Sequence, residues 1–327
     1  MTENITTLII AVCMTSALAA ACRSSEGDAR IHQFENYSFD RHARPPSRAG
    51  MPPRMVLGYL QRLDNRTDYA PYLPSDAERA VVGDAYRILP ERTKSVLENR
   101  LIGIYFIKNF TGNGLCEWVV DRRGKVYIFL VFNPRALGKT ASELLTEKEQ
   151  TCFFRDDPSI EIRVDCGNTI PGFYYILLHE SAHAVDYVLN ITPFVDEEYK
   201  RQLGIKKTKS EFTKNSWAGY NTSKEHFIFS QRVSFYGMDA PKLKSSEAVA
   251  VYKDLARSPF ASLYGSMSWA EDLAELAAFY HITHVLKGPY AIHVVQKKKT
   301  IFSVRPMETA AVIERLPMIR IFYSRGT

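Results

Sequence analysis

Strand-like and helix-like runs of apolar residues alternate along the chain. Residues 101–110 (LIGIYFIKNF) and 125–132 (KVYIFLVF) are rich in β-branched and aromatic residues, which predicts two strands. Another strand-like run, 118–121, is joined to 125–132 by Arg122-Arg123-Gly124, where glycine supplies the positive φ of a tight connection. The pattern therefore predicts a β-hairpin over 118–132.

Four segments have helical character: 90–99, 141–149, 172–190 and 267–285. The apolar residues of 172–190 are too continuous for a surface helix, so we expect this helix to be buried at the centre of the protein. The last forty residues add two strand-like runs and a short helix, at 291–295, 301–304 and around 308–316. Strands followed by helices predict an α+β fold.

The composition divides the chain into unequal parts. Residues 22–54 contain Pro, Arg, Ser and Gly with few aliphatic residues, so we predict a flexible linker there. From Met55 the aliphatic residues return, and 55–327 is long enough for one large domain. Within it, 191–262 is more polar and mixed, which suggests an insertion that could act as a lid or a specificity element.

The N-terminus has the pattern of an export signal. A short hydrophobic run, Thr6 to Ala21, ends in small residues and meets Cys22, after which the chain turns polar. Leu18-Ala19-Ala20-Ala21-Cys22 resembles a bacterial lipobox, which implies that 1–21 is a signal peptide and that Cys22 is acylated. We therefore expect a lipid-anchored protein of the bacterial cell envelope, facing the periplasm or the exterior. Plain secretion and a buried N-terminal helix are the alternatives.

Charge and hydropathy argue against a nucleic-acid partner and against a membrane-spanning helix, while the lipid anchor would still attach the protein to a membrane. The chain of 327 residues has 42 Lys and Arg against 36 Asp and Glu, and its net charge of +6 is scattered, so we expect no nucleic-acid partner. The one run of like charges, Lys297 to Lys299, is interpreted as a solvated turn or helix end. No segment reaches the roughly 18 apolar residues that a bilayer-spanning helix needs.

Three cysteines remain after the leader and the acylated Cys22 are set aside. An odd number in an oxidising compartment predicts one disulfide and one free thiol among Cys116, Cys152 and Cys166. Cys152 and Cys166 flank a short segment and form the preferred pair, although spacing alone does not fix the connectivity.

The central helix carries His179-Glu180-Ser181-Ala182-His183, an HExxH motif. Residues four apart lie one turn apart on the same helix face, so the two imidazoles can bind a single zinc ion. Glu180 projects beside them, where it can take a proton from a metal-activated water. Because two histidines and a glutamate are costly to bury without a ligand, we favour a metal site over a purely structural helix.

A catalytic zinc needs a third protein ligand, and the second apolar helix offers one. Glu271 and Glu275 stand four residues apart on the same side of that helix. We predict that Glu271 binds the metal while Glu275 hydrogen-bonds the outer nitrogen of a ligand histidine. Asp272 is the runner-up ligand. His281 and His284 are interpreted as packing or hydrogen-bonding residues, with metal binding as the weaker alternative.

The segments HESAHAVDY and YGSMSWAEDLAEL together resemble the zinc protease domain of anthrax lethal factor, a gluzincin. That family combines HExxHAVD with a Tyr-Gly pair seven residues before an ExxAE acid, and Tyr264-Gly265 precedes Glu271 by this interval. The resemblance implies a zincin-like fold, with a small mixed sheet packed against the HExxH helix and a second ligand-bearing helix. It also implies that Tyr264 donates a hydrogen bond to the oxyanion or leaving group.

These features predict a zinc-dependent endopeptidase that holds one Zn²⁺ per chain and hydrolyses peptide or protein substrates through a metal-activated water. The resemblance further implies an edge strand beside the active-site helix for substrate pairing, from 117–132 or from 159–165. A catalytically inactive zincin-fold binding lipoprotein and a non-peptidase metallohydrolase are the alternative functions.

Overall fold

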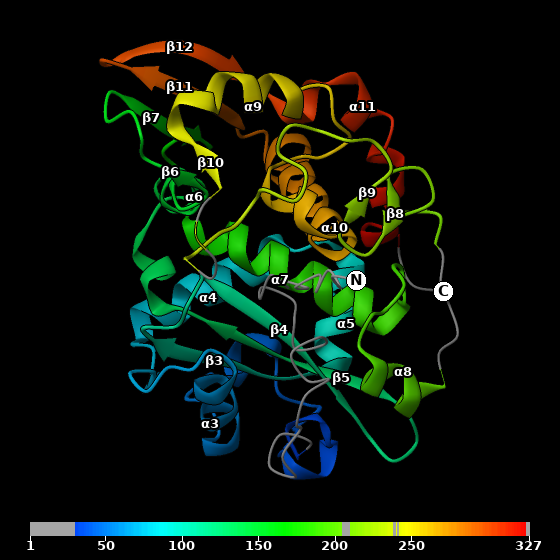
Figure 1. Cartoon of the computed structure of the whole chain (residues 1–327). Helices are drawn as coiled ribbons and strands as arrows, with labels where there is room; N and C mark the ends of the chain where they lie inside the picture. The colour runs from blue at the N-terminus through cyan, green and yellow to red at the C-terminus, as the bar shows by residue number, and fades with distance from the viewer. Residues whose placement is uncertain (1–29, 205–209, 238–239, 241, 325–327) are drawn as a thin grey trace, which may run out of the picture.

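The protein is described by a computed structural model that covers residues 30–204, 210–237, 240 and 242–324. Its central element is a mixed sheet whose strands follow the order β1 (Ala49–Gly50), β3 (Leu101–Lys108), β5 (Val126–Phe132), β4 (Gly114–Val120), with β2 (Ala70–Tyr72) beside β3 (Figure 1). β3 and β5 run parallel, and β4 and β5 form the predicted antiparallel hairpin. Gly124 in its turn has φ +75°, which glycine adopts without strain. In this strand order β4 pairs with β5 on one side and is the edge strand of the sheet.

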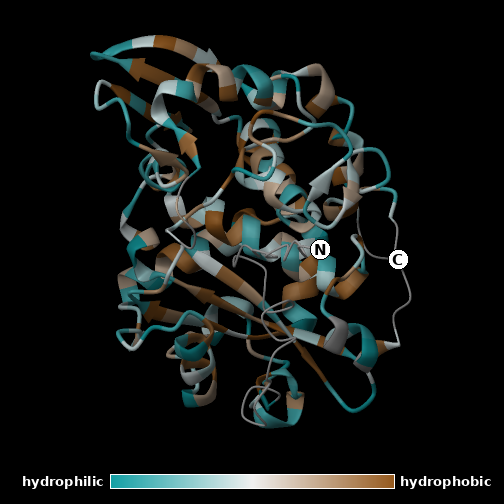
Figure 2. Ribbon diagram, in the orientation of Figure 1, coloured by the Kyte–Doolittle hydropathy of each residue, from teal (hydrophilic) through white to brown (hydrophobic). Residues whose placement is uncertain are grey.

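The strands are apolar throughout because both faces of the sheet are covered. In β5, Ile128, Leu130 and Phe132 belong to the main core, whereas Tyr127, Phe129 and Val131 belong to a second core on the opposite face. The brown strands in Figure 2 show this continuous hydrophobic character. α3 (Arg54–Leu63) covers the second face through Val56, Tyr59 and Leu60.

The linker prediction is wrong for residues 30–54, which pack against this second face. Ile31 is fully buried, Phe34 stacks on Tyr127 with ring centroids 4.1 Å apart, and Ala49–Gly50 pairs with β3 as strand β1. Arg48 donates hydrogen bonds to the carbonyls of Leu97 and Leu101. A few aromatic residues anchor the segment on an apolar sheet surface that would otherwise be exposed to water.

Helices α4 (Asp76–Ile88), α5 (Glu91–Arg100) and α7 (Gly172–Leu189) lie on the main-core face. α10 (Trp269–Tyr280) packs on the other side of α7, so that α7 lies between the sheet and α10 (Figure 1). This arrangement confirms the predicted central helix and the α+β class. α10 is shorter than predicted, because its last residues form a π-turn at His281–Val285.

The remaining helices and strands lie outside the central sheet. They are α6 (Ala141–Gln150), a sheet of β7 (Ile160–Asp165), β11 (Ala291–Gln296) and β12 (Lys299–Val304), the short pairs β6 (Phe153–Phe154) with β10 (Leu243–Lys244) and β8 (Trp217–Gly219) with β9 (Thr222–Ser223), and the helices α8 (Glu197–Leu203), α9 (Ala248–Leu255) and α11 (Ala310–Ile313). Lys297 and Lys298, with positive φ, form the β11–β12 turn, as predicted for this lysine run.

In the region 191–262, Phe229, Phe235 and Phe260 are buried in the main core. The described part of this region is therefore built into the same body.

The preferred disulfide is absent, because Cys116, Cys152 and Cys166 are all free and buried. The backbone N–H of Cys166 donates to Ser142 Oγ at the start of α6, whereas Cys152 follows the end of that helix. At 1.5 Å per residue, the ten residues from Ser142 to Cys152 span about 15 Å, well beyond the roughly 4.4–6.8 Å between the Cα atoms of a disulfide. Packing α6 along β7 thus separates two cysteines that are close in sequence.

Among the described residues, none of the helices is long and apolar enough to cross a membrane. The export signal at 6–21 and the acylation site at Cys22 lie outside the described residues.

Glu149, at the end of α6, makes the stability of the fold depend on pH. Its side chain is buried and accepts a hydrogen bond from Tyr252 (2.7 Å), and burial raises its pKa to about 7. The protonated carboxyl is favoured in the folded state, so its stabilising contribution is present below about pH 4.5 and is lost as the pH rises through 7. We expect the unfolding free energy to fall by roughly 3 kcal/mol over this interval, and Glu149→Gln to remove that fall. Denaturant unfolding at pH 5 and 7.5 measures the change in unfolding free energy of the wild type and the variant.

Glu147→Gln is the matched control, because Glu147 lies on the exposed side of the same helix. This variant should keep the pH dependence of the wild type. An unchanged slope in Glu149→Gln would show that another group is responsible.

Candidate metal centre

The HExxH residues lie in the middle of α7, which packs against the sheet on one side and against α10 on the other. Gly172 begins the helix where a Cβ would lie 3.0 Å from the carbonyl oxygen of Lys139, so glycine permits this close approach. Asn190 ends it in the left-handed conformation, with φ 53°. His179 and His183 project from one face of the helix, and their Nε2 atoms are 3.2 Å apart.

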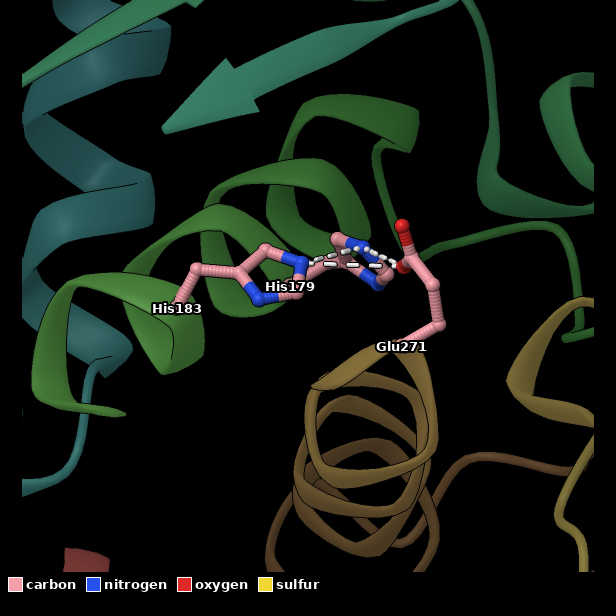
Figure 3. A group of neighbouring side chains, drawn as sticks. All are labelled: His179, His183 and Glu271. Atoms are coloured by element: carbon pink, nitrogen blue, oxygen red, sulfur yellow. Dashed lines mark hydrogen bonds and ion pairs between the residues drawn. The ribbon is translucent and has the colours of Figure 1, made fainter. Parts of the chain in front are cut away.

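Glu271 reaches the two histidines from α10. Ser268 caps this helix and accepts a hydrogen bond from the backbone N–H of Glu271, which places the glutamate in the first turn. Glu271 Oε2 lies 3.0 Å from His179 Nε2 and 3.6 Å from His183 Nε2. Figure 3 shows the two imidazoles and the carboxylate converging from the two helices.

This group can hold a metal ion. Around a tetrahedral zinc ion, donor atoms at about 2.0–2.2 Å lie roughly 3.3–3.5 Å from one another, and the observed separations of 3.0, 3.2 and 3.6 Å bracket that value. Both carboxylate oxygens of Glu271 are buried, and Oε2 faces the Nε2 atoms of the two histidines. A buried carboxylate needs positive charge beside it, which a metal ion held by the two neutral imidazoles would supply.

The electrostatics of the triad favour a cation. Burial by itself lowers the pKa of His179, but contacts with Glu271 and Glu275 outweigh it and raise the pKa to about 10. Burial raises the pKa of Glu271, but the two imidazoles outweigh this effect and hold it at about 2. The carboxylates of Glu271 and Glu275 thus stabilise positive charge at the histidines. Either protons or a metal ion can carry that charge.

An outer network fixes the tautomer of His179. Its Nδ1 lies 2.9 Å from Glu275 Oε1, so in the neutral imidazole that a metal ligand must be, the proton stays on Nδ1 and the Nε2 lone pair faces the triad. Glu275 also accepts hydrogen bonds from Tyr175 and from Ser262 (2.5 Å), and Lys148 Nζ lies 3.3 Å away. The position of Glu275 is the one that its spacing from Glu271 predicted.

Three members of this network escaped the sequence analysis. Tyr175 stands four residues before His179 on α7, and this helical spacing was an available signal. Lys148 comes from α6 and is 127 residues from Glu275, and Ser262 precedes the Tyr-Gly pair by two positions. Neither has a local pattern that points to the site.

Glu180 and Tyr264 line the same pocket beside the triad. Burial raises the pKa of Glu180. A Cβ at Gly114 would lie 2.6 Å from Glu180 Oε1, so glycine at the start of β4 makes room for this carboxylate. The Tyr264 ring centroid lies 5.8 Å from that of His179, and Lys148 Nζ lies 3.5 Å from the Tyr264 ring centroid, a cation–π contact.

The runner-up ligands lie elsewhere. Asp272 accepts hydrogen bonds from both terminal nitrogens of Arg315, at 2.9 and 2.6 Å, and from Trp217 Nε1. His281 Nδ1 lies 2.7 Å from the Tyr323 hydroxyl, and His284 Nδ1 lies 2.8 Å from Thr283 Oγ1. Asp272 points away from the triad because it is one residue, about 100°, around the helix from Glu271.

Comparisons of the chain with models of protein families, with curated protein sequences and with solved structures find no match.

Proposed function

We propose that the protein is a zinc-dependent endopeptidase of the gluzincin type, with a zincin-like fold around α7 and α10. The observation that carries the proposal is the buried His179–His183–Glu271 triad with the Glu180 carboxylate in the adjoining pocket. Two imidazoles and one carboxylate are a donor set of catalytic zinc sites, in which a fourth position is left for water or substrate. One zinc ion per chain suits this group.

Each residue of the site has a defined task in hydrolysis. His179, His183 and Glu271 hold the metal, which when bound supplies Lewis acidity that polarises a carbonyl oxygen and makes water a better nucleophile. Glu180 accepts the proton of the attacking water and passes it to the leaving amine. Tyr264 donates a hydrogen bond to the developing oxyanion, and Lys148 against its ring holds it at the pocket.

The sheet provides a docking edge for an extended peptide. β4 is the last strand of its sheet, and its first residue, Gly114, lies against Glu180. Among the described residues, the pairing recorded on the outer side of β4 is a single bridge between Gln33 and Val120. Of the two candidate substrate strands, the hairpin strand β4 is favoured over 159–165, because β7 belongs to the other sheet and packs on α6. Strand addition at this edge suits a peptide substrate better than a small amide or ester.

The test is metal content together with proteolysis of the full chain. We expect one zinc per chain by elemental analysis and cleavage of unfolded casein that a chelator stops and zinc restores. Stoichiometric zinc without cleavage of casein or of a peptide library would favour a binding protein or a non-peptidase hydrolase. A folded protein that holds no zinc under excess metal would overturn the proposal.

The leader adds an expected location. If Cys22 is acylated, the enzyme acts at the bacterial cell envelope, and mass spectrometry of the mature N-terminus measures this independently of zinc binding.

A further inference from the structure

A second pocket adjoins the triad on the side of His183. It is bounded by the second half of α7, the loop that follows it, Tyr220 and the start of α10. Its walls are mainly aromatic and aliphatic: Tyr187, Phe194, Val195, Tyr220 and Trp269. The functional roles given above do not use this pocket.

The aromatic walls are held in place by contacts of their own. Trp269 Nε1 donates to the carbonyl of Pro193 (2.9 Å), and the backbone N–H of Trp269 donates to the carbonyl of Tyr220 (3.0 Å). The rings of Tyr187 and Phe194 stack with centroids 5.3 Å apart. A pocket with fixed walls loses little conformational entropy when a side chain enters it.

The carboxylates in the pocket are already engaged. Asp186 accepts hydrogen bonds from the backbone N–H and the hydroxyl of Thr192, at 2.7 and 2.5 Å. Asp196 accepts a hydrogen bond from the backbone N–H of Tyr199 (2.9 Å) at the start of α8. Their negative charge disfavours an acidic guest, while the walls favour a large apolar or aromatic one.

The direction of β4 orients a bound peptide over the two pockets. β4 starts at Gly114 beside Glu180 and runs toward Trp118, which packs in one cluster with Tyr187, Phe194 and Tyr199. Tyr187 and Phe194 also line the second pocket. A peptide paired antiparallel to β4, the more stable mode of pairing, therefore places its N-terminal part toward the second pocket and its C-terminal part toward Lys148.

We propose that this pocket is a specificity site for a large aromatic or apolar side chain on the N-terminal side of the scissile bond. The inference rests on the proposed function, since it assumes that the substrate is a peptide held at the His179–His183–Glu271 triad. It adds a substrate class: peptides with phenylalanine, tyrosine or leucine just before the bond that is cut.

N-acetyl amino acid hydroxamates test the pocket without turnover. In these probes the side chain precedes the metal-binding group, as it would precede a scissile carbonyl. With zinc-loaded protein, we expect the phenylalanine derivative to bind at least about 10-fold more tightly than the alanine derivative, and the aspartate derivative to bind most weakly. Calorimetry gives the three dissociation constants.

A matched pair of variants then locates the effect. Val195→Trp should fill the pocket and reduce the preference for phenylalanine over alanine to about 2-fold or less, with zinc content and alanine-probe affinity kept. Val285→Trp makes the same change at an exposed residue at the end of the π-turn, and should keep the full preference.

The outcomes separate the two proposals. Equal affinity for the phenylalanine and alanine probes, or a preference that survives in Val195→Trp, would overturn the pocket assignment even if casein is cleaved. The expected preference without cleavage of casein or of a peptide library would keep an apolar pocket beside the metal site and refute the peptidase. Protein that holds no zinc and binds none of the probes would overturn both.

Discussion

Replacement of Glu180 by Gln is expected to lower peptide hydrolysis by about 10²–10⁴-fold while the protein keeps its zinc. The amide has the size of the carboxylate and fits the space that Gly114 leaves, but it cannot accept the proton of the attacking water. The three ligand side chains are unchanged, so metal binding should be within about 2-fold of the wild type. Initial rates on a fluorogenic peptide, with zinc content measured on the same samples, give both quantities.

Glu149→Gln is the matched control for this experiment. Glu149 is also a buried glutamate, but it hydrogen-bonds Tyr252 and does not line the pocket beside the triad. It should retain most of the wild-type rate at pH 7. A Glu180→Gln protein that hydrolyses peptides within tenfold of the wild type would show that Glu180 is not the general base.

Patterns of short range predicted the core of the site. The i, i+4 spacing of His179 and His183 holds wherever that segment is helical, and the apolar run around it made a helix the expected structure. The position of Glu271 needed a second step, since only the packing of α10 on α7 brings it to the histidines. We predicted this contact from two glutamates, Glu271 and Glu275, at helical spacing. The Tyr-Gly pair seven residues before Glu271, which resembles the gluzincin pattern, pointed to the same residue.

Long-range packing accounts for what the sequence did not reveal. In 22–54 a few apolar residues stand among many prolines and arginines, yet Ile31 and Phe34 pack on the sheet face, and β1 pairs with β3. Cys152 and Cys166 are close in sequence, yet they lie near opposite ends of α6, because β7 packs along that helix. Lys148 reaches the site only because α6 packs beside α7, and no local pattern encodes that contact.

The second large effect is expected for Glu271→Ala, which should weaken zinc binding by at least about 100-fold. Removing the carboxylate leaves two imidazoles, and it also removes one of the two buried negative charges that attract a cation to the triad. Zinc at 100 times its dissociation constant stabilises a folded protein by about 2.7 kcal/mol, so the wild type should show a zinc-dependent rise in Tm that the variant lacks. Thermal unfolding with and without zinc measures this difference.

Asp272→Asn is the control that separates metal binding from the stability of α10. Asp272 is the next residue along the helix, and its ion pair with Arg315 ties α10 to the C-terminal segment. Asp272→Asn should lower the Tm with and without zinc by similar amounts, because it weakens a buried ion pair without touching the triad. Glu271→Ala should instead lower the Tm mainly in the presence of zinc. If Glu271→Ala kept one tightly bound zinc per chain, the third ligand would have to be another residue, and the assignment of α10 as the second ligand helix would fall.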